Sequence, residues 1–422
     1  MCNKQSTQCF RTVLIAVALF PLVSAFFPFS QIQIDVAGIH LSSEDILAIS
    51  GALFLSIVYL IMPGNVSAVF RSQCVYLSCF FVICCFSALL TWDDTHLEAL
   101  YLLVRMASYY YFANALVGIV IKLELDIRLL AGRIIRVFLA LVLLIMAYNF
   151  IVYEVPFGNI RLQWPGVGAV IAGCTAAMGI GYLLLYESRE DGRSFSAIGI
   201  ILLLLLALCS QSRAGVYASF ALAIYRFFPR HNAAYVVLCF LGLVTVVLAF
   251  DPVGIISQTR MGIFESARFD TWKSALQIFF EGNLFTQLFG YGFGAVFPYI
   301  EWSSAYASGE IVRGLTDGAW NQFVFHSHVM LVQPHNVLVY FLLEIGIVGS
   351  LFFLGYFFYL FFSVRNNASR ISIHRFGLLL VTALLLNCFD SVFIINVASS
   401  FWWVLILLAF AELVVDRKRS AQ

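Results

Sequence analysis

The stretch 335–362, HNVLVYFLLEIGIVGSLFFLGYFFYLFF, decides the fold because it is too apolar to cover a surface that faces water. Glu344 is its one acidic residue, and it contains no Lys or Arg. A helix needs about 20 consecutive apolar residues to cross the hydrocarbon core of a bilayer. The stretch therefore predicts a membrane span.

Similar stretches recur along the 422 residues, of which 62% are hydrophobic and 11% charged. A water-soluble protein has about a quarter charged residues, so the bilayer must be the main solvent of this chain. We predict an all-α membrane protein with about twelve transmembrane helices. The predicted spans are 12–28, 45–62, 72–90, 97–121, 134–153, 165–186, 194–209, 214–228, 233–250, 335–362, 374–392 and 397–415.

The distribution of positive charge predicts the orientation. If the N-terminus lies in the cytoplasm, most of the 24 Lys and Arg residues fall in cytoplasmic loops and tails, as the positive-inside rule requires. Both termini are then cytoplasmic. Residues 1–250 hold the first nine spans, 251–333 form one large periplasmic loop, and 334–422 hold the last three spans. A loop of that length predicts short helices and a function of its own.

Composition also limits the partners. The formal net charge is only +1, which argues against nucleic acid as a ligand. His326, His328 and His335 match no zinc spacing, and no Cys or close carboxylate completes a ligand set, so we expect no metal. We expect no other cofactor, and membrane lipids are expected contacts.

Arg213 stands in the tight turn between two predicted spans, on the predicted outer side. Its guanidinium could anchor the helix at the interface. It could equally bind a phosphate through two parallel hydrogen bonds.

Arg268 lies within an apolar stripe of a predicted amphipathic helix over 262–281, four residues before Trp272. One interpretation is an ion pair with Glu265. The interpretation that we favour is contact with a lipid phosphate at the membrane surface.

His335 and Asn336 follow Pro334 and open the tenth span. A histidine there is either a cap at the membrane surface or a base or phosphate ligand. Arg105 and Glu344 are candidate supporting residues, because charges inside a membrane are costly. The tyrosines after Arg105 could instead bind it structurally. The glycines in 289–294 give a weak signal for a phosphate cradle.

These motifs together resemble the O-antigen ligase and O-antigen polymerase superfamily. The pattern H-N-x9-G-x-x-G runs from His335 to Gly349, Ser-Arg-Ala-Gly occupies 212–215, and Arg-x-x-x-Trp occupies 268–272. The resemblance implies a glycosyltransferase of the C-type architecture in a bacterial inner membrane. Such enzymes take a glycan from undecaprenyl diphosphate on the periplasmic side, without a nucleotide sugar.

Carried onto this chain, the resemblance implies that Arg213 and Arg268 bind the donor diphosphate and that His335 assists the reaction. Asn336, Trp272, Arg105 and Glu344 would support them. We expect a ligase that transfers glycan to the lipid A–core oligosaccharide in lipopolysaccharide biosynthesis. The alternatives are a polymerase that joins lipid-linked repeats and a non-enzymatic flippase of lipid-linked glycan.

Overall fold

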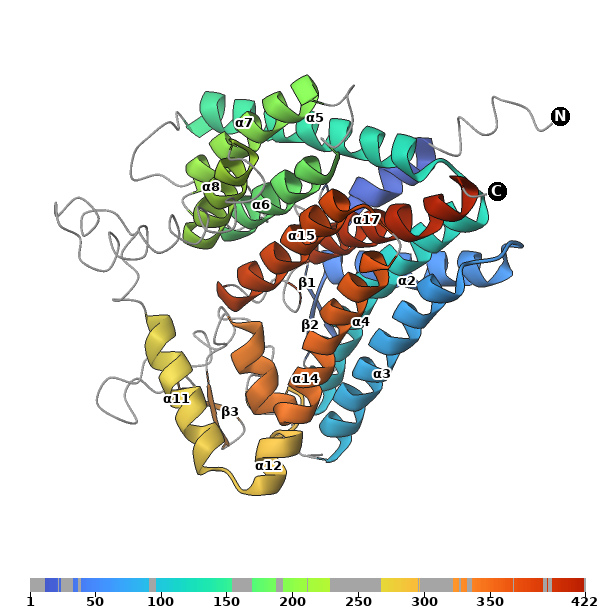
Figure 1. Cartoon of the computed structure of the whole chain (residues 1–422). Coiled ribbons are helices and arrows are strands. Elements are labelled where there is room, and N and C mark those ends of the chain that lie inside the picture. The colour runs from blue at the N-terminus through green and yellow to red at the C-terminus, as the bar shows by residue number, and fades with distance from the viewer. Residues whose placement is uncertain are drawn as a thin grey trace.

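The computed structural model is predominantly helical (Figure 1). It describes residues 12–21, 23, 33–36, 39–90, 96–153, 169–186, 193–210, 212–227, 267–294, 296, 322–325, 328–331, 336–366, 368–389, 393 and 397–420. The labelled helices are α2 Ser43–Ile61, α3 Ala68–Leu90, α4 His96–Lys122, α5 Ile127–Tyr153, α6 Ala169–Tyr186, α7 Arg193–Ser210, α8 Arg213–Phe227, α11 Ala267–Glu281, α12 Leu284–Phe289, α14 Val337–Arg365, α15 Arg370–Phe389 and α17 Ala398–Ser420.

Five helices in the described part of the chain are long and apolar enough to cross a membrane. They occupy Ala68–Leu89, Ala99–Lys122, Ile127–Ile151, Val337–Arg365 and Arg370–Cys388. Shorter apolar helices cover Thr12–Pro21, Asp45–Ile61, Val170–Tyr186, Phe195–Ser210 and Ala398–Val414. These helices confirm an α-helical, membrane-embedded protein. The predicted span 233–250 lies outside the described residues, so the number twelve stays a prediction.

Two short antiparallel hairpins were not predicted for this chain. Strands β1 (Gln33–Val36) and β2 (Ile39–Ser42) form the first, and β3 (Gln322–Phe325) and β4 (His328–Leu331) the second. In the first hairpin Ile34 lies opposite Leu41 and Val36 opposite Ile39. This strict alternation of apolar and polar residues is a strand signal, which the search for long apolar runs overlooked.

Helices α2 and α4 run parallel, because both their starts and their ends meet. At the start, Asp45 of α2 binds residues in the first turns of α4. At the end, Lys122 Nζ donates to the carbonyl oxygens of Tyr59 at 2.6 Å and Met62 at 2.9 Å. Between them, a Cβ on Gly118 would lie 2.6 Å from the Tyr59 ring, so a glycine is needed for this approach.

A buried polar cluster joins α3, α4 and α14. Gln73 Nε2 donates to Asn114 Oδ1 at 2.7 Å. The hydroxyls of Tyr110 and Tyr356 both donate to Gln73 Oε1, at 2.5 and 2.8 Å. Hydrogen bonds between side chains of neighbouring helices stabilise packing where water is absent. The cluster holds the three helices in register beside the ring of Trp403 of α17.

Candidate functional site

Arg213 is the first residue of α8, at a turn whose geometry is tightly fixed. Ser212 precedes it, and the Ser212 Oγ accepts a hydrogen bond from the Gly215 amide at 3.2 Å. The Ser212 carbonyl accepts from the Val216 amide at 2.7 Å. These bonds satisfy amides that a helix start would otherwise leave open. The sequence Ser-Arg-Ala-Gly therefore reads as a capped helix start with a cation at its first position.

Two glycines allow this turn to pack directly against α6. A Cβ on Gly173 of α6 would lie 2.5 Å from Ser210 Oγ and 2.6 Å from Ser212 Cβ. A Cβ on Gly215 would collide with the Gly173 backbone. Backbones in direct contact leave the helix start little freedom, so the base of the Arg213 side chain is held in a fixed place.

Tyr217 follows Arg213 by one turn on the same face of α8, and the sequence reasoning missed it. Its hydroxyl is buried and has no hydrogen-bond partner within the described part of the chain. Arg213 lies close enough for its charge to act on that hydroxyl. A buried donor without an acceptor is rare and calls for an explanation. The signal in the sequence was a Tyr four residues after an Arg at a helix start.

Arg268 is the second residue of α11, which confirms a helix there, although the helix is described only from Ala267. Ala275 and Phe279 are buried and Trp272 is partly buried, as the predicted stripe requires. The side chain of Arg268 lies outside the described part of the structure, as does Glu265, so the choice between phosphate contact and ion pair remains a prediction.

His335 also lies outside the described residues, but its neighbour does not. Asn336 is the N-cap of α14, and its Oδ1 accepts from the amides of Leu338 at 3.0 Å and Val339 at 3.2 Å. Its side-chain oxygen is therefore used by the helix start. This geometry makes Asn336 a cap that orients the chain next to His335.

Glu344 is fully buried on α14. It binds the segment that follows α12, residues 290–294 and 296, which we call the glycine loop. The Gly294 amide donates to Glu344 Oε2, and the Val296 amide donates to Oε1 at 3.0 Å. The predicted phosphate cradle at 289–294 thus holds a carboxylate of the protein itself. Backbone amides that converge on an anion can bind a carboxylate as well as a phosphate.

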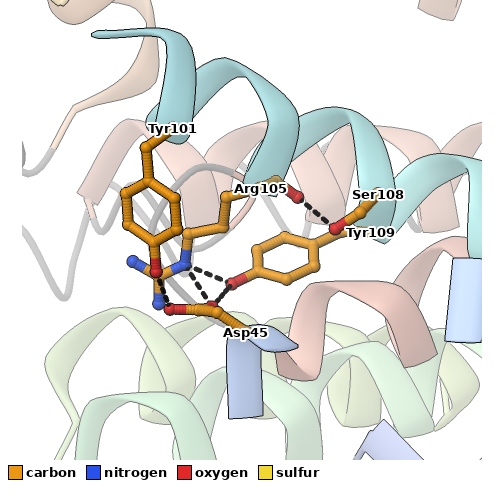
Figure 2. A network of polar contacts seen from close by, with 5 residues as sticks. All are labelled: Asp45, Tyr101, Arg105, Ser108 and Tyr109. Carbon is orange, nitrogen blue, oxygen red and sulfur yellow. Dashed lines mark hydrogen bonds and ion pairs between the residues drawn. The ribbon is translucent and has the colours of Figure 1, made fainter. Parts of the chain in front are cut away.

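Arg105 forms an ion pair with Asp45, as Figure 2 shows. Its Nε lies 2.6 Å from Asp45 Oδ1 and donates to the Tyr109 hydroxyl at 2.5 Å. Tyr101 and Tyr109 also donate to the Asp45 carboxylate, Tyr109 at 2.9 Å. Arg105 and Asp45 are buried. The structural interpretation of Arg105 through a following tyrosine is confirmed for Tyr109, and Asp45 is a partner that the sequence reasoning missed.

The metal interpretation rested on three histidines. His328 lies in β4, whereas His326 and His335 lie outside the described residues. Within the described ranges, no group of three His, Cys, Asp or Glu side chains could hold a metal ion.

Comparisons with models of known protein families and with curated proteins gave no match.

Proposed function

We propose that this protein is a membrane glycosyltransferase that moves a glycan from undecaprenyl diphosphate to the lipid A–core oligosaccharide at the periplasmic face. The proposal rests on the resemblance of its motifs to the O-antigen ligase and polymerase superfamily. The observation that carries it furthest is the buried Tyr217 hydroxyl, which has no hydrogen-bond partner among the described residues and lies one helical turn after the cation Arg213 on α8. A phosphate oxygen would supply an acceptor for it.

The positions of Arg213 and His335 also favour an anionic ligand. Arg213 is the first residue of α8, and His335 directly precedes the cap of α14. Helix starts present amides with partial positive charge, which attract phosphate groups. In the proposed reaction Arg213 and Arg268 neutralise the diphosphate leaving group, and His335 removes the proton from the attacking hydroxyl.

Alanine at Arg213, Arg268 or His335 should abolish transfer, because each variant removes a group that stabilises the developing charge or moves the proton. Transfer is measured with purified protein in proteoliposomes that contain the lipid-linked donor and lipid A–core. The amount of folded protein in each variant must match wild type. Near-normal transfer in all three variants would show that these residues do not form the site. A chelator should leave transfer unchanged, and activity lost to a chelator and restored by zinc would revive the histidine metal site.

The variant Tyr217→Phe tests whether the Tyr217 hydroxyl binds the donor phosphate. Removing a buried donor without a partner should raise the free energy of unfolding by about 1 kcal/mol. If the hydroxyl binds donor phosphate, the same variant should lose donor affinity by about tenfold, the equivalent of one such hydrogen bond. Thermal unfolding in detergent and direct binding of the donor lipid measure the two effects. A more stable variant with unchanged donor affinity would remove Tyr217 from the site.

A deletion strain distinguishes the ligase from the polymerase. Loss of all core-attached glycan with accumulation of lipid-linked polymer is the result expected for a ligase. A single repeat on the core would instead show a polymerase. If the purified protein moves intact lipid-linked glycan across a bilayer and transfers none of it, the protein is a flippase and neither a ligase nor a polymerase.

A further inference from the structure

Two sets of hydrogen bonds connect the glycine loop to α14, and we call them together the joint. One part is the Glu344 carboxylate, with an oxygen for each of the amides of Gly294 and Val296. The other part is main chain, because the Tyr291 amide donates to the Leu343 carbonyl at 2.9 Å and the Gly292 amide to the Glu344 carbonyl at 3.0 Å. Four hydrogen bonds thus converge on two adjacent residues of α14.

A break in α14 makes this joint possible. Gly346 has a φ of 67°, which interrupts the helix just after Glu344. In an unbroken helix the carbonyls of Leu343 and Glu344 would bond to amides four residues later. A side chain at Gly346 would be strained by its φ and would collide with the Leu288 backbone, and one at Gly290 would collide with Glu344. Irregular backbone at membrane depth persists only where protein surrounds it and satisfies its polar groups.

The joint is also braced from other helices. Ser87, near the end of α3, donates from Oγ to the Glu344 carbonyl at 3.2 Å. A Cβ on Gly294 would lie 2.6 Å from Cα of Ala99 in α4, so the loop lies directly against that helix.

The glycine loop in turn holds α11. The Tyr291 hydroxyl donates to the Ile278 carbonyl at 3.1 Å, near the end of α11. Gln287 of α12 donates from Nε2 to the Gly282 carbonyl at 3.0 Å, which fixes the turn between α11 and α12. A continuous series of bonds therefore runs from the helix that carries Arg268 to the helix whose cap adjoins His335.

We propose that Glu344 is a positioning residue that fixes α11, and with it Arg268, relative to the first turn of α14. The inference rests on the proposed function for the roles of Arg268 and His335, but the joint itself does not. Catalysis between groups on separate elements depends on their mutual placement, and a misplacement of about 1 Å can cost about 100-fold in rate.

A carboxylate suits this position because it accepts at both oxygens. Glutamine accepts at one and presents a donor to the second amide, so Glu344→Gln breaks one of the two side-chain bonds of the joint at almost constant volume. Glu344→Asp keeps both acceptors but shortens their reach by one methylene group. The matched control is Glu412→Gln, which removes a buried carboxylate of a different helix, α17, that pairs with Arg128 at 3.4 Å.

The experiment uses the full-length protein in detergent and in proteoliposomes, with three measurements. Amide hydrogen exchange of 290–296 reports the joint. Spin labels at Gln277→Cys on α11 and Leu338→Cys on α14, in a background without the native cysteines, report the distance between the helices. Transfer kinetics per folded molecule report kcat, and direct binding of the donor lipid reports affinity.

In Glu344→Gln we expect faster exchange in 290–296, a broadened or shifted distance between the labels, and a kcat lower by roughly 10- to 100-fold. Donor affinity should fall less than kcat, because Arg268 moves with α11 while Arg213 on α8 still binds the diphosphate. Glu412→Gln should leave all of these unchanged even if it lowers the melting temperature.

If Glu344→Gln changes neither the amide hydrogen exchange of 290–296 nor the distance between the spin labels, Glu344 does not hold the glycine loop or α11 in place, whatever the activity of the variant. A disturbed joint with normal kcat would overturn the positioning role and leave the proposed function intact. If wild-type protein transfers no glycan, the proposed function fails, and with it the catalytic role of Glu344. The exchange and distance measurements would still decide whether Glu344 places α11.

Discussion

At the scale of single residues, the charges inside the helices have partners that lie far away in the sequence. Arg105 and Glu344 were singled out because charge in hydrocarbon is costly, and both proved to be buried and bound. Their partners were not predictable, since Asp45 and the Gly294 amide meet them only through the fold.

Breaking the Asp45–Arg105 pair should be costly. Arg105→Met removes the cation that pairs with a buried carboxylate, so we expect the free energy of unfolding to fall by about 3–5 kcal/mol. The double variant Asp45→Asn/Arg105→Met should lose less than the sum of the two single changes. Reversible unfolding in mixed detergent measures both quantities.

The control for that prediction is a second ion pair among the described residues, between Arg128 and Glu412. The Arg128 side chain is 54% exposed, and its Nε lies 3.4 Å from the carboxylate. Arg128→Met should therefore cost less than about 1 kcal/mol. Equal losses from Arg105→Met and Arg128→Met would show that burial does not set the strength of these pairs.

At the scale of elements, hydrophobic length predicted helices well and their irregularities poorly. The predicted span 97–121 is α4, His96–Lys122, and the predicted 335–362 is α14, Val337–Arg365. The break at Gly346 was missed, although that glycine was part of the family pattern. A count of apolar residues cannot detect a break whose carbonyls are satisfied by a distant loop.

The candidate site was predictable only in part for the same reason. Helix starts at Arg213 and Asn336 follow from local sequence, because Ser and Asn are common caps. That the Tyr217 hydroxyl finds no partner among the described residues depends on what surrounds it, and no local rule gives that. Whether Arg213, Arg268 and His335 form one site remains a prediction.

The contact between α6 and α8 gives a prediction at this scale. Gly215→Ala should destabilise the protein and lower donor affinity, because its methyl group would push the start of α8 away from the Gly173 backbone. Gly51→Ala is the control, since its Cβ would meet only the Phe112 ring at an ordinary 3.4 Å. Melting temperature and donor binding are measured for both. If Gly215→Ala behaves like Gly51→Ala, the close packing does not hold Arg213.

At the scale of the whole molecule, the proposed orientation places α11 outside and the start of α5 in the cytoplasm. In a cysteine-free background, Gln277→Cys in spheroplasts should react with a maleimide that cannot cross membranes. Arg128→Cys should react only after the membrane is permeabilised. Both side chains are exposed, so access to reagent depends on the side of the membrane. The reverse labelling pattern would show that the protein has the opposite orientation in the membrane, and it would exclude a periplasmic site.

The ion pair between Asp45 and Arg105 also bears on how the chain is made. Synthesis runs from the N-terminus, so α2 leaves the ribosome with Asp45 before α4 and Arg105 exist. The carboxylate stands in the first turns of α2, beside hairpin β1–β2, and must wait at the water boundary until α4 arrives. Insertion of α2 therefore becomes secure only as a pair with α4. In a chain stalled after α3, the first turn of α2 should therefore stay open to water-soluble reagents, whereas in the completed chain, where Asp45 is buried, it should be protected.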